Sequence, residues 1–295
     1  MEYCLRLGNG IGNKIFVLVY YLFKYPNDTI YVADQLSVHQ KGTEEEKIWY
    51  LYPQLLNNPG IKFVSFKKYL ELKEAGMPKL NEEFRIPLYN VEGFSKLSIR
   101  KYFKVRTDLD YLAKKYDLDN GLFIHFRLGD KFFINYESLQ KGHPLNYVVM
   151  KPEFYLKYIK LFKGPVYIFS DSPEIAKCMF PGFNHAEEGV NETVYCFQNC
   201  KNAIISDSTM SIAALKLNNR RYNAIVPGYT IIRRNLQIAP FFECSARVTL
   251  ELDKSLMLTK RKDYADIVNK CNANKSSLTE LRELYKTIRD VNTEE

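Results

Sequence analysis

The sequence lacks an apolar run long enough to cross a membrane. Its longest run, IFVLVYYLF at residues 15–23, lies between Lys14 and Lys24, whereas a membrane-spanning helix needs about 20 apolar residues. The N-terminus also lacks the charged leader and small-residue cleavage site of a secretory signal peptide. We therefore expect a soluble, cytoplasmic protein with no membrane span.

Cysteine is sparse and lacks the spacing of a metal site. Of the six cysteines, Cys196 and Cys200 form a C-x-x-x-C pattern with no second pair, which is too few ligands for a tetrahedral zinc ion. In a reducing compartment we expect free thiols in or near the core. The sequence therefore predicts no zinc site.

Motifs typical of nucleic-acid-binding proteins are missing too, as are internal repeats. The net charge is +8, but lysine and arginine are interleaved with acidic residues rather than gathered in one block. This pattern favours an anionic small ligand or an acidic surface over a nucleic-acid partner.

The residues that are present predict an α/β fold. Hydrophobic residues make up 46% of the chain and charged residues 26%, which is typical of globular proteins. Strand-like runs alternate with helical patterns, which favours parallel sheets flanked by helices. The predicted strands are residues 3–7, 29–33, 61–66, 121–126, 165–170, 202–206 and 222–228. The predicted helices are residues 13–24 and 151–164, one from Pro173 capped by Asp171 or Ser172, one that begins near SDSTMSIAALKLN at 206–218, and one after Ser277.

The same patterns suggest a division of the chain into three parts. Residues 67–118 are rich in lysine and glutamate, and their segment 73–87 is typical of a loop. We predict an N-terminal domain over 1–118, a second domain over 119–270, and a C-terminal helix within 271–295 that packs on the body.

Polar residues cluster where predicted strands end, which is where doubly wound sheets bind ligands. IHFRLGD at 124–130 places His125 and Arg127 on one face of a strand end, and a guanidinium suits a phosphate group. The alternative is structural, with Arg127 paired to Asp130 and His125 bonded within the core. VYIFSDSPE at 166–174 is by itself more typical of a helix cap than of a functional site.

Two further stretches have the same placement. In IISDSTMSIAA at 204–214, residues Ser206 to Thr209 and Ser211 offer more hydroxyls than one helix cap requires. LGNGIGNKIF at 7–16 does not match the phosphate-loop pattern, because its lysine is misplaced. Its glycines still allow a ligand to approach the backbone closely.

Taken in order, four stretches resemble the α-1,2-fucosyltransferases (glycosyltransferase family 11) and, more distantly, the α-1,6- and protein O-fucosyltransferases. Those families carry G-L-G-N-Q-M-F, H-x-R-R-G-D-Y, F-S-D-D and N-S-T-F-S-W-W. This chain has GIGNKIF at 10–16, HFRLGD at 125–130, FSDS at 169–172 and DSTMS at 207–211.

The resemblance implies a GT-B architecture, with two Rossmann-like domains facing a cleft. It also implies an inverting, metal-independent glycosyltransferase that uses a nucleotide sugar, typically GDP-β-L-fucose, and a glycan or glycoconjugate acceptor, with no cofactor. No D-x-D metal motif is needed, and the two DLD stretches at 108–110 and 117–119 are expected to be surface acids.

The resemblance also assigns roles to residues. Arg127 would hold the diphosphate, and His125 would shape the donor pocket. Asp171 would face the nucleobase. The other donor-binding residues would be Gly10, Gly12, Asn13, Ser208, Thr209 and Ser211.

A base for the acceptor hydroxyl is less clearly indicated. Asp130, Asp34 and Glu2 are the carboxylates nearest the motifs in sequence. We predict Asp130, with orientation of Arg127 as its alternative role.

The motifs differ from the family pattern at several positions. Leu128 replaces the second arginine, Ser172 the second aspartate, and Lys14 the glutamine. Another donor, such as UDP-xylose or another GDP-sugar, and a degenerate nucleotide- or sugar-binding module therefore remain as alternatives.

Overall fold

The computed structural model describes residues 1–8, 10–35, 47–80, 92–232, 235–238 and 248–272. The chain divides into two compact units. The first comprises Met1–Lys114 and Ile212–Leu217, and the second comprises Lys115–Ser211 and Asn218–Glu295. No helix in the described ranges has both the length and the hydropathy needed to cross a membrane.

The first unit contains a parallel sheet in the order β1-β2-β3. Its strands are β1 (Glu2–Leu7), β2 (Thr29–Asp34) and β3 (Ile61–Phe63). Helix α1 (Ile11–Lys24) connects β1 to β2 and buries most of its length, because its apolar residues are nearly continuous. The shorter helices of this unit are α2 (Ile48–Leu51), η2 (Pro53–Asn57), α3 (Phe66–Glu74), η3 (Glu92–Ser95), α5 (Leu97–Arg100), η4 (Thr107–Tyr111) and α6 (Leu112–Lys115), which ends at the boundary.

The second unit contains a parallel six-stranded sheet in the order β11-β8-β7-β4-β5-β6. Its strands are β4 (Leu122–Phe126), β5 (Val166–Ser170), β6 (Asn184–His185), β7 (Asn202–Ile204), β8 (Asn223–Pro227) and β11 (Val248–Glu251). Its helices are α7 (Gly129–Gln140), α8 (Pro152–Ile159), α9 (Pro173–Met179), α10 (Val190–Asn199), α11 (Thr209–Leu217, shared with the first unit), η5 (Lys254–Leu256) and α12 (Arg261–Asn272). An antiparallel pair, β9 (Tyr229–Ile232) and β10 (Asn235–Ile238), completes the unit.

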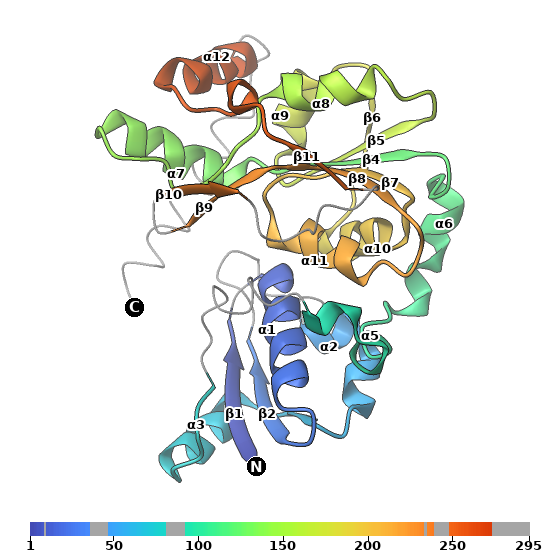
Figure 1. The fold of residues 1–295 in the computed structure, drawn as a ribbon, viewed down its shortest axis with the longest axis vertical. Helices are drawn as coiled ribbons and strands as arrows, with labels where there is room; N and C mark the ends of the chain where they lie inside the picture. The colour runs from blue at the N-terminus through green and yellow to red at the C-terminus, as the bar shows by residue number, and fades with distance from the viewer. Residues whose placement is uncertain (9, 36–46, 81–91, 233–234, 239–247, 273–295) are drawn as a thin grey trace. The chain divides into compact units, whose positions relative to one another are not determined.

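Helices cover both faces of this sheet. Successive side chains of a strand point to opposite faces, and on β4 Phe123 contacts Phe197 of α10, whereas Phe126 contacts Tyr155 of α8. Figure 1 shows α8 and α9 on one side of the sheet and α10 on the other. Because both faces are buried, β4 is apolar at nearly every position, and its hydrophobic run is continuous rather than alternating.

The α/β fold class is confirmed, and each predicted strand is present, although β3 ends at Phe63. Helix α8 ends at Ile159 rather than near 164, because the N–H groups of Leu161 and Phe162 bond carbonyls three residues back and tighten the last turn. The prediction missed α3 within the polar stretch 67–118, since Tyr69 is its only buried residue. The helix predicted after Ser277 lies outside the described residues.

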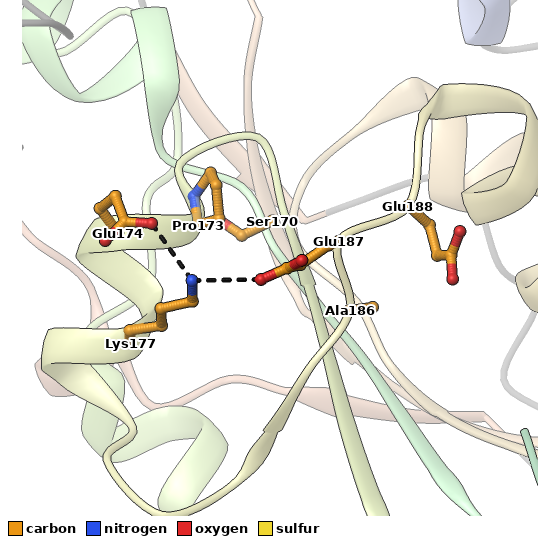
Figure 2. Close-up of a pocket in the computed structure, with 7 residues that line it drawn as sticks. All are labelled: Ser170, Pro173, Glu174, Lys177, Ala186, Glu187 and Glu188. Atoms are coloured by element: carbon orange, nitrogen blue, oxygen red, sulfur yellow. Dashed lines mark hydrogen bonds and ion pairs between the residues drawn. The ribbon is translucent and has the colours of Figure 1, made fainter.

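Strands β5 and β6 lead to a cavity of about 250 Å³ beyond their carboxyl ends. Figure 2 shows the side chains that line it. They are Ser170, Pro173, Glu174, Lys177, Ala186, Glu187 and Glu188. The ammonium group of Lys177 lies 3.2 Å from Glu174 and 3.4 Å from Glu187. Because Glu188 also lines the cavity, its lining has three carboxylates and one ammonium group.

Candidate active site at the end of strand β4

Strand order places the sequence motifs of the second unit together. Counted along the chain from β4, the six strands lie in the order 3-2-1-4-5-6, with the reversal between β4 and β7. In doubly wound sheets, ligands bind at the carboxyl ends of the strands at this reversal. The motifs at 125–130, 169–172 and 206–211 follow the adjacent strands β4, β5 and β7, so the structure brings these three motifs to one edge of the sheet.

The hydroxyl of Ser206 joins β4 to the segment after β7. Its Oγ donates to the carbonyl of His125 (2.5 Å) and accepts from the backbone N–H of Arg127 (2.8 Å). The hydroxyl of Tyr155 on α8 lies 2.9 Å from the same atom. Ser206 is buried, so it fixes the backbone that carries Arg127.

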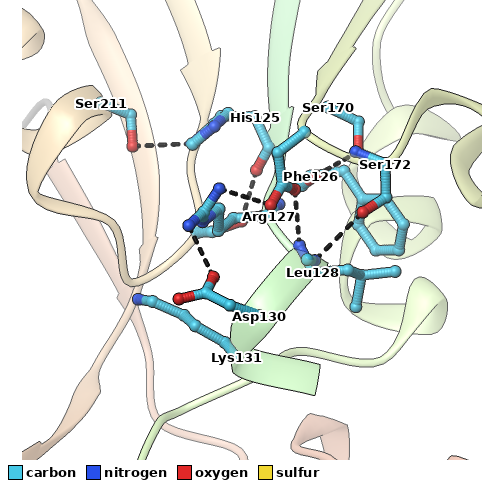
Figure 3. Close-up of polar contacts among 12 residues, drawn as sticks. His125, Phe126, Arg127, Leu128, Asp130, Lys131, Ser170, Ser172 and Ser211 are labelled. Atoms are coloured by element: carbon cyan, nitrogen blue, oxygen red, sulfur yellow. Dashed lines mark hydrogen bonds and ion pairs between the residues drawn. The ribbon is translucent and has the colours of Figure 1, made fainter. Parts of the chain in front are cut away.

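The guanidinium of Arg127 lies between the carboxylates of Asp130 and Asp171, and Figure 3 shows its pair with Asp130. Nη2 is 2.7 Å from Oδ1 of Asp130, and Nη1 pairs with Oδ2 of Asp171. Burial by itself lowers the pKa of Arg127, but the two carboxylates raise it by a larger amount. The pKa of Arg127 therefore lies above its ordinary value. The guanidinium is therefore permanently charged. Its side chain is 29% exposed, so a ligand can still reach it.

Gly129 begins helix α7 and allows this arrangement. Its φ of 35° favours glycine, and a Cβ atom there would overlap with Oδ2 of Asp171. The N–H of Gly129 donates to Ser172 Oγ (3.1 Å), and that of Leu128 donates to Asp171 Oδ1 (2.9 Å). Two side chains that follow β5 thus hold the backbone where α7 begins.

These contacts correct the predicted cap of α9. Ser172 is its N-cap residue, but its side chain makes no cap hydrogen bond. The hydroxyl of Ser172 and the carboxylate of Asp171 instead accept from the segment after β4. Helix α7 was itself missed, because it begins at a glycine with no side-chain cap.

His125 is a buried neutral imidazole. It is 3% exposed, and its Nδ1 lies 3.0 Å from Oγ of Ser211, which is fully buried. Burial, together with the positive charges of Arg127 and Lys131, lowers the pKa of His125 to about 3. The side chains of His125 and Ser211 are therefore both buried rather than exposed at the end of β4.

A second pair of charged residues lies beside Arg127. The ammonium group of Lys131 on α7 donates to the backbone carbonyl of Asp207, and Asp207 Oδ2 accepts from Thr230 (3.2 Å). Burial lowers the pKa of Lys131 and raises that of Asp207, although each is partly offset by the other's charge. Sequence reasoning missed Lys131, because it takes the place of a tyrosine in the family motif.

The remaining predicted residues have different surroundings. Ser208 is buried, and its carbonyl accepts from Ser211 (3.3 Å), whereas Thr209 is partly exposed at the first position of α11. Gly10 and Gly12 lie in the first unit, at and just after the N-cap of α1. The side-chain oxygen of Asn13 is buried and has no hydrogen-bond partner among the described residues.

Two other carboxylates considered as the base lie in the first unit. Asp34 is buried, 2.6 Å from the ammonium group of Lys14, and accepts from the N–H of Ile48 (2.6 Å). Its oxygens are therefore engaged in holding α1 and α2 to β2. Glu2, at the start of β1, is exposed and accepts from Tyr31 (2.9 Å).

The acidic residues of the two DLD stretches are exposed, as expected for surface acids. Asp108 pairs with Arg106, and Asp119 lies 2.7 Å from Lys201. Asp117 accepts from the N–H groups of Asp119 and Asn120, as in a turn.

Comparisons with known proteins found similarity in structure only. No family model matches the sequence, and no curated protein matches it. Similar solved structures include the fucosyltransferase NodZ from Bradyrhizobium, with 12% identity over 80% of this chain and 97% of that chain and a TM-score of 0.44. The E. coli heptosyltransferase WaaC with ADP has 9% identity over 94% and 100%, with a TM-score of 0.39. A glycosyl transferase family 9 protein from Veillonella parvula has 10% identity over 92% and 96%, with a TM-score of 0.37.

Proposed function

We propose that this chain is a glycosyltransferase of the GT-B type that moves a sugar from a nucleoside-diphosphate sugar to the hydroxyl of a glycan or glycoconjugate. The observation that carries the proposal is the position of Arg127. It is a fixed, partly exposed guanidinium at the end of the central strand β4, where strand order reverses. A guanidinium in this place suits a diphosphate group.

The reaction would proceed by direct displacement with inversion at the anomeric carbon. The acceptor oxygen forms a bond to that carbon, the bond from carbon to the β-phosphate oxygen breaks, and the nucleoside diphosphate leaves. Negative charge grows on the β-phosphate, where Arg127 and the N-terminus of α7 can stabilise it without a metal ion. The acceptor proton would pass to a carboxylate, for which Asp130 is our candidate.

The cavity beyond β5 and β6 supports a guanine base and thus GDP-fucose or another GDP-sugar. Guanine presents N–H donors at N1 and N2, which suit carboxylate acceptors such as Glu187 and Glu188. Lys177 could donate to its O6. Uracil presents mostly carbonyl acceptors, which carboxylates disfavour. In this proposal the cavity holds the base, and Asp171, engaged with Arg127, holds the site together.

The other predicted donor-binding residues keep supporting roles in the proposal. Thr209 and Ser208 lie at the start of α11, where a helix N-terminus favours an anion. His125 supports the pocket from below. Gly10, Gly12 and Asn13 are proposed to contact the donor or acceptor from the first unit.

The test compares Arg127→Ala with Arg220→Ala. Arg220 is also a partly exposed arginine paired with a carboxylate, that of Asp119, but it precedes β8 and so lies at the amino end of the sheet. We expect Arg127→Ala to abolish transfer and the thermal stabilisation by GDP, whereas Arg220→Ala keeps both. Unchanged turnover in Arg127→Ala would contradict the assignment.

Thermal unfolding of the wild type with nucleotides and their sugars tests the donor. A ligand at about 100 times its Kd adds roughly 2.7 kcal/mol of stability. We expect stabilisation by GDP and GDP-fucose that survives EDTA. A preference for UDP-sugars would mean that the donor is a UDP-sugar rather than GDP-fucose. Binding of nucleotide without turnover on any acceptor would favour a degenerate binding module.

A further inference from the structure

The arginine of the site is already occupied. One guanidinium faces the two carboxylates of Asp130 and Asp171, so this trio carries a net negative charge before any ligand arrives. The positive charge of Lys131 also acts on Asp130 and Asp171, but the Asp207 carboxylate beside it carries the opposite charge, so the five groups together still carry a net negative charge. A diphosphate brings further negative charge to the same place. Charge repulsion therefore favours binding of such a ligand when a carboxylate gives up its contact with Arg127.

The two carboxylates are not held equally. Asp171 accepts from Arg127 and also from the backbone N–H of Leu128 (2.9 Å), and it follows β5, which is paired to β4. Asp130 lies in the first turn of α7 and, among the described residues, hydrogen bonds only to Arg127. The side chains of Asp130 and Asp171 are equally exposed, at 19% and 20%, so the two differ only in their hydrogen bonds. Asp130 can therefore rotate toward solvent, whereas the movement of Asp171 would break a second hydrogen bond.

We propose that Asp130 is a resident counter-ion of Arg127 that the ligand's diphosphate displaces, while Asp171 stays in place. The inference rests on the proposed function, because it takes the ligand to be a diphosphate. The exchange would also release the Asp130 carboxylate from its cation only once the donor is bound. Donor binding would thereby precede and enable the use of Asp130 as a base.

The test is calorimetric titration of the intact protein with inorganic pyrophosphate and, separately, with GDP. Asp130→Asn keeps the shape of the side chain but removes the competing charge. The matched control is Glu137→Gln, which removes one carboxylate from the same helix, two turns further on, where Glu137 lies 3.9 Å from Lys141. Asp130→Ala serves as a second variant that lacks the carboxylate.

We expect Asp130→Asn and Asp130→Ala to bind pyrophosphate about fivefold more tightly than the wild type, since the loss of a partly exposed pair is worth up to about 1 kcal/mol. Glu137→Gln should change affinity by less than about twofold. Weaker or equal binding by both Asp130 variants would overturn the exchange, as would the absence of pyrophosphate binding. If the affinities of the wild type and the variants for pyrophosphate differ as expected but GDP does not bind, the displacement of Asp130 is supported and the nucleotide-sugar function is refuted.

Discussion

Replacement of Gly129 by alanine should destabilise the second unit by about 2.5–5 kcal/mol. Part of this cost is backbone strain, because φ at this residue is 35° and the left-handed region costs a non-glycine residue about 1–2 kcal/mol. The rest arises because the new Cβ overlaps with Oδ2 of Asp171. That carboxylate must then leave Arg127, and loss of a hydrogen bond to a charged group costs about 1.5–3 kcal/mol.

Gly142→Ala provides the control for strain alone. Gly142 has a φ of 69°, but a Cβ there would meet open space. Chemical denaturation should be followed by far-UV circular dichroism, because the chain's single tryptophan, Trp49, lies in the first unit. We expect Gly129→Ala to lower the free energy of unfolding by at least 1 kcal/mol more than Gly142→Ala does, by the overlap alone. An equal or smaller loss would refute the claim that the overlap with Asp171 matters.

Three further substitutions test other parts of the structure. Ser206→Ala leaves the N–H of Arg127 and the hydroxyl of Tyr155 without their partner, and denaturation should show a loss of about 2–4 kcal/mol. The pKa of His125 is lowered to about 3 in the folded state, whereas its value in the unfolded chain is about 6.5. The contribution of His125 to the free energy of unfolding is therefore full above a pH of about 6.5. It falls by up to roughly 1.4 kcal/mol per pH unit as the pH decreases toward about 3. His125→Gln should reduce that slope, and an unchanged pH profile would contradict burial of the neutral ring. Lys14→Met leaves the Asp34 carboxylate buried without its cation, and fluorescence of Trp49 should report a loss of about 3–5 kcal/mol, most of which Asp34→Leu in the same chain restores.

The sequence was sufficient to predict β4 and the polar residues that follow it. A continuous apolar run such as LFIHF indicates a strand buried on both faces, and a charged residue directly after it must lie at the strand's end. It was not sufficient to predict α7, because Gly129 is a poor indicator of a helix start and no side chain caps it. A local sequence pattern predicts a helix or strand where its hydrophobic pattern is strong. It fails where tertiary contacts determine the secondary structure, as at the start of α7.

The partners of the site residues depend on strand order, which the sequence does not reveal. Asp171 reaches Arg127 only because β5 lies beside β4, and Ser206 reaches the same segment because β7 lies on the other side. In the local sequence pattern, Ser206 and Ser211 are equivalent hydroxyls near a helix start, and the family resemblance assigns a role to Ser211 alone. The structure separates them, since one bonds the backbone of β4 and the other bonds His125.

The central position of β4 has a consequence for motion. The strand is hydrogen bonded to neighbours on both edges, and its side chains are buried on both faces. Its amide protons should be among the slowest of the chain to exchange with solvent, since such elements open only when the whole unit unfolds. Arg127 follows directly from this strand, so its backbone is expected to stay almost still while a ligand binds and leaves. In the proposed transfer reaction, any rearrangement would then come from side chains and from segments that approach the arginine, rather than from its own backbone.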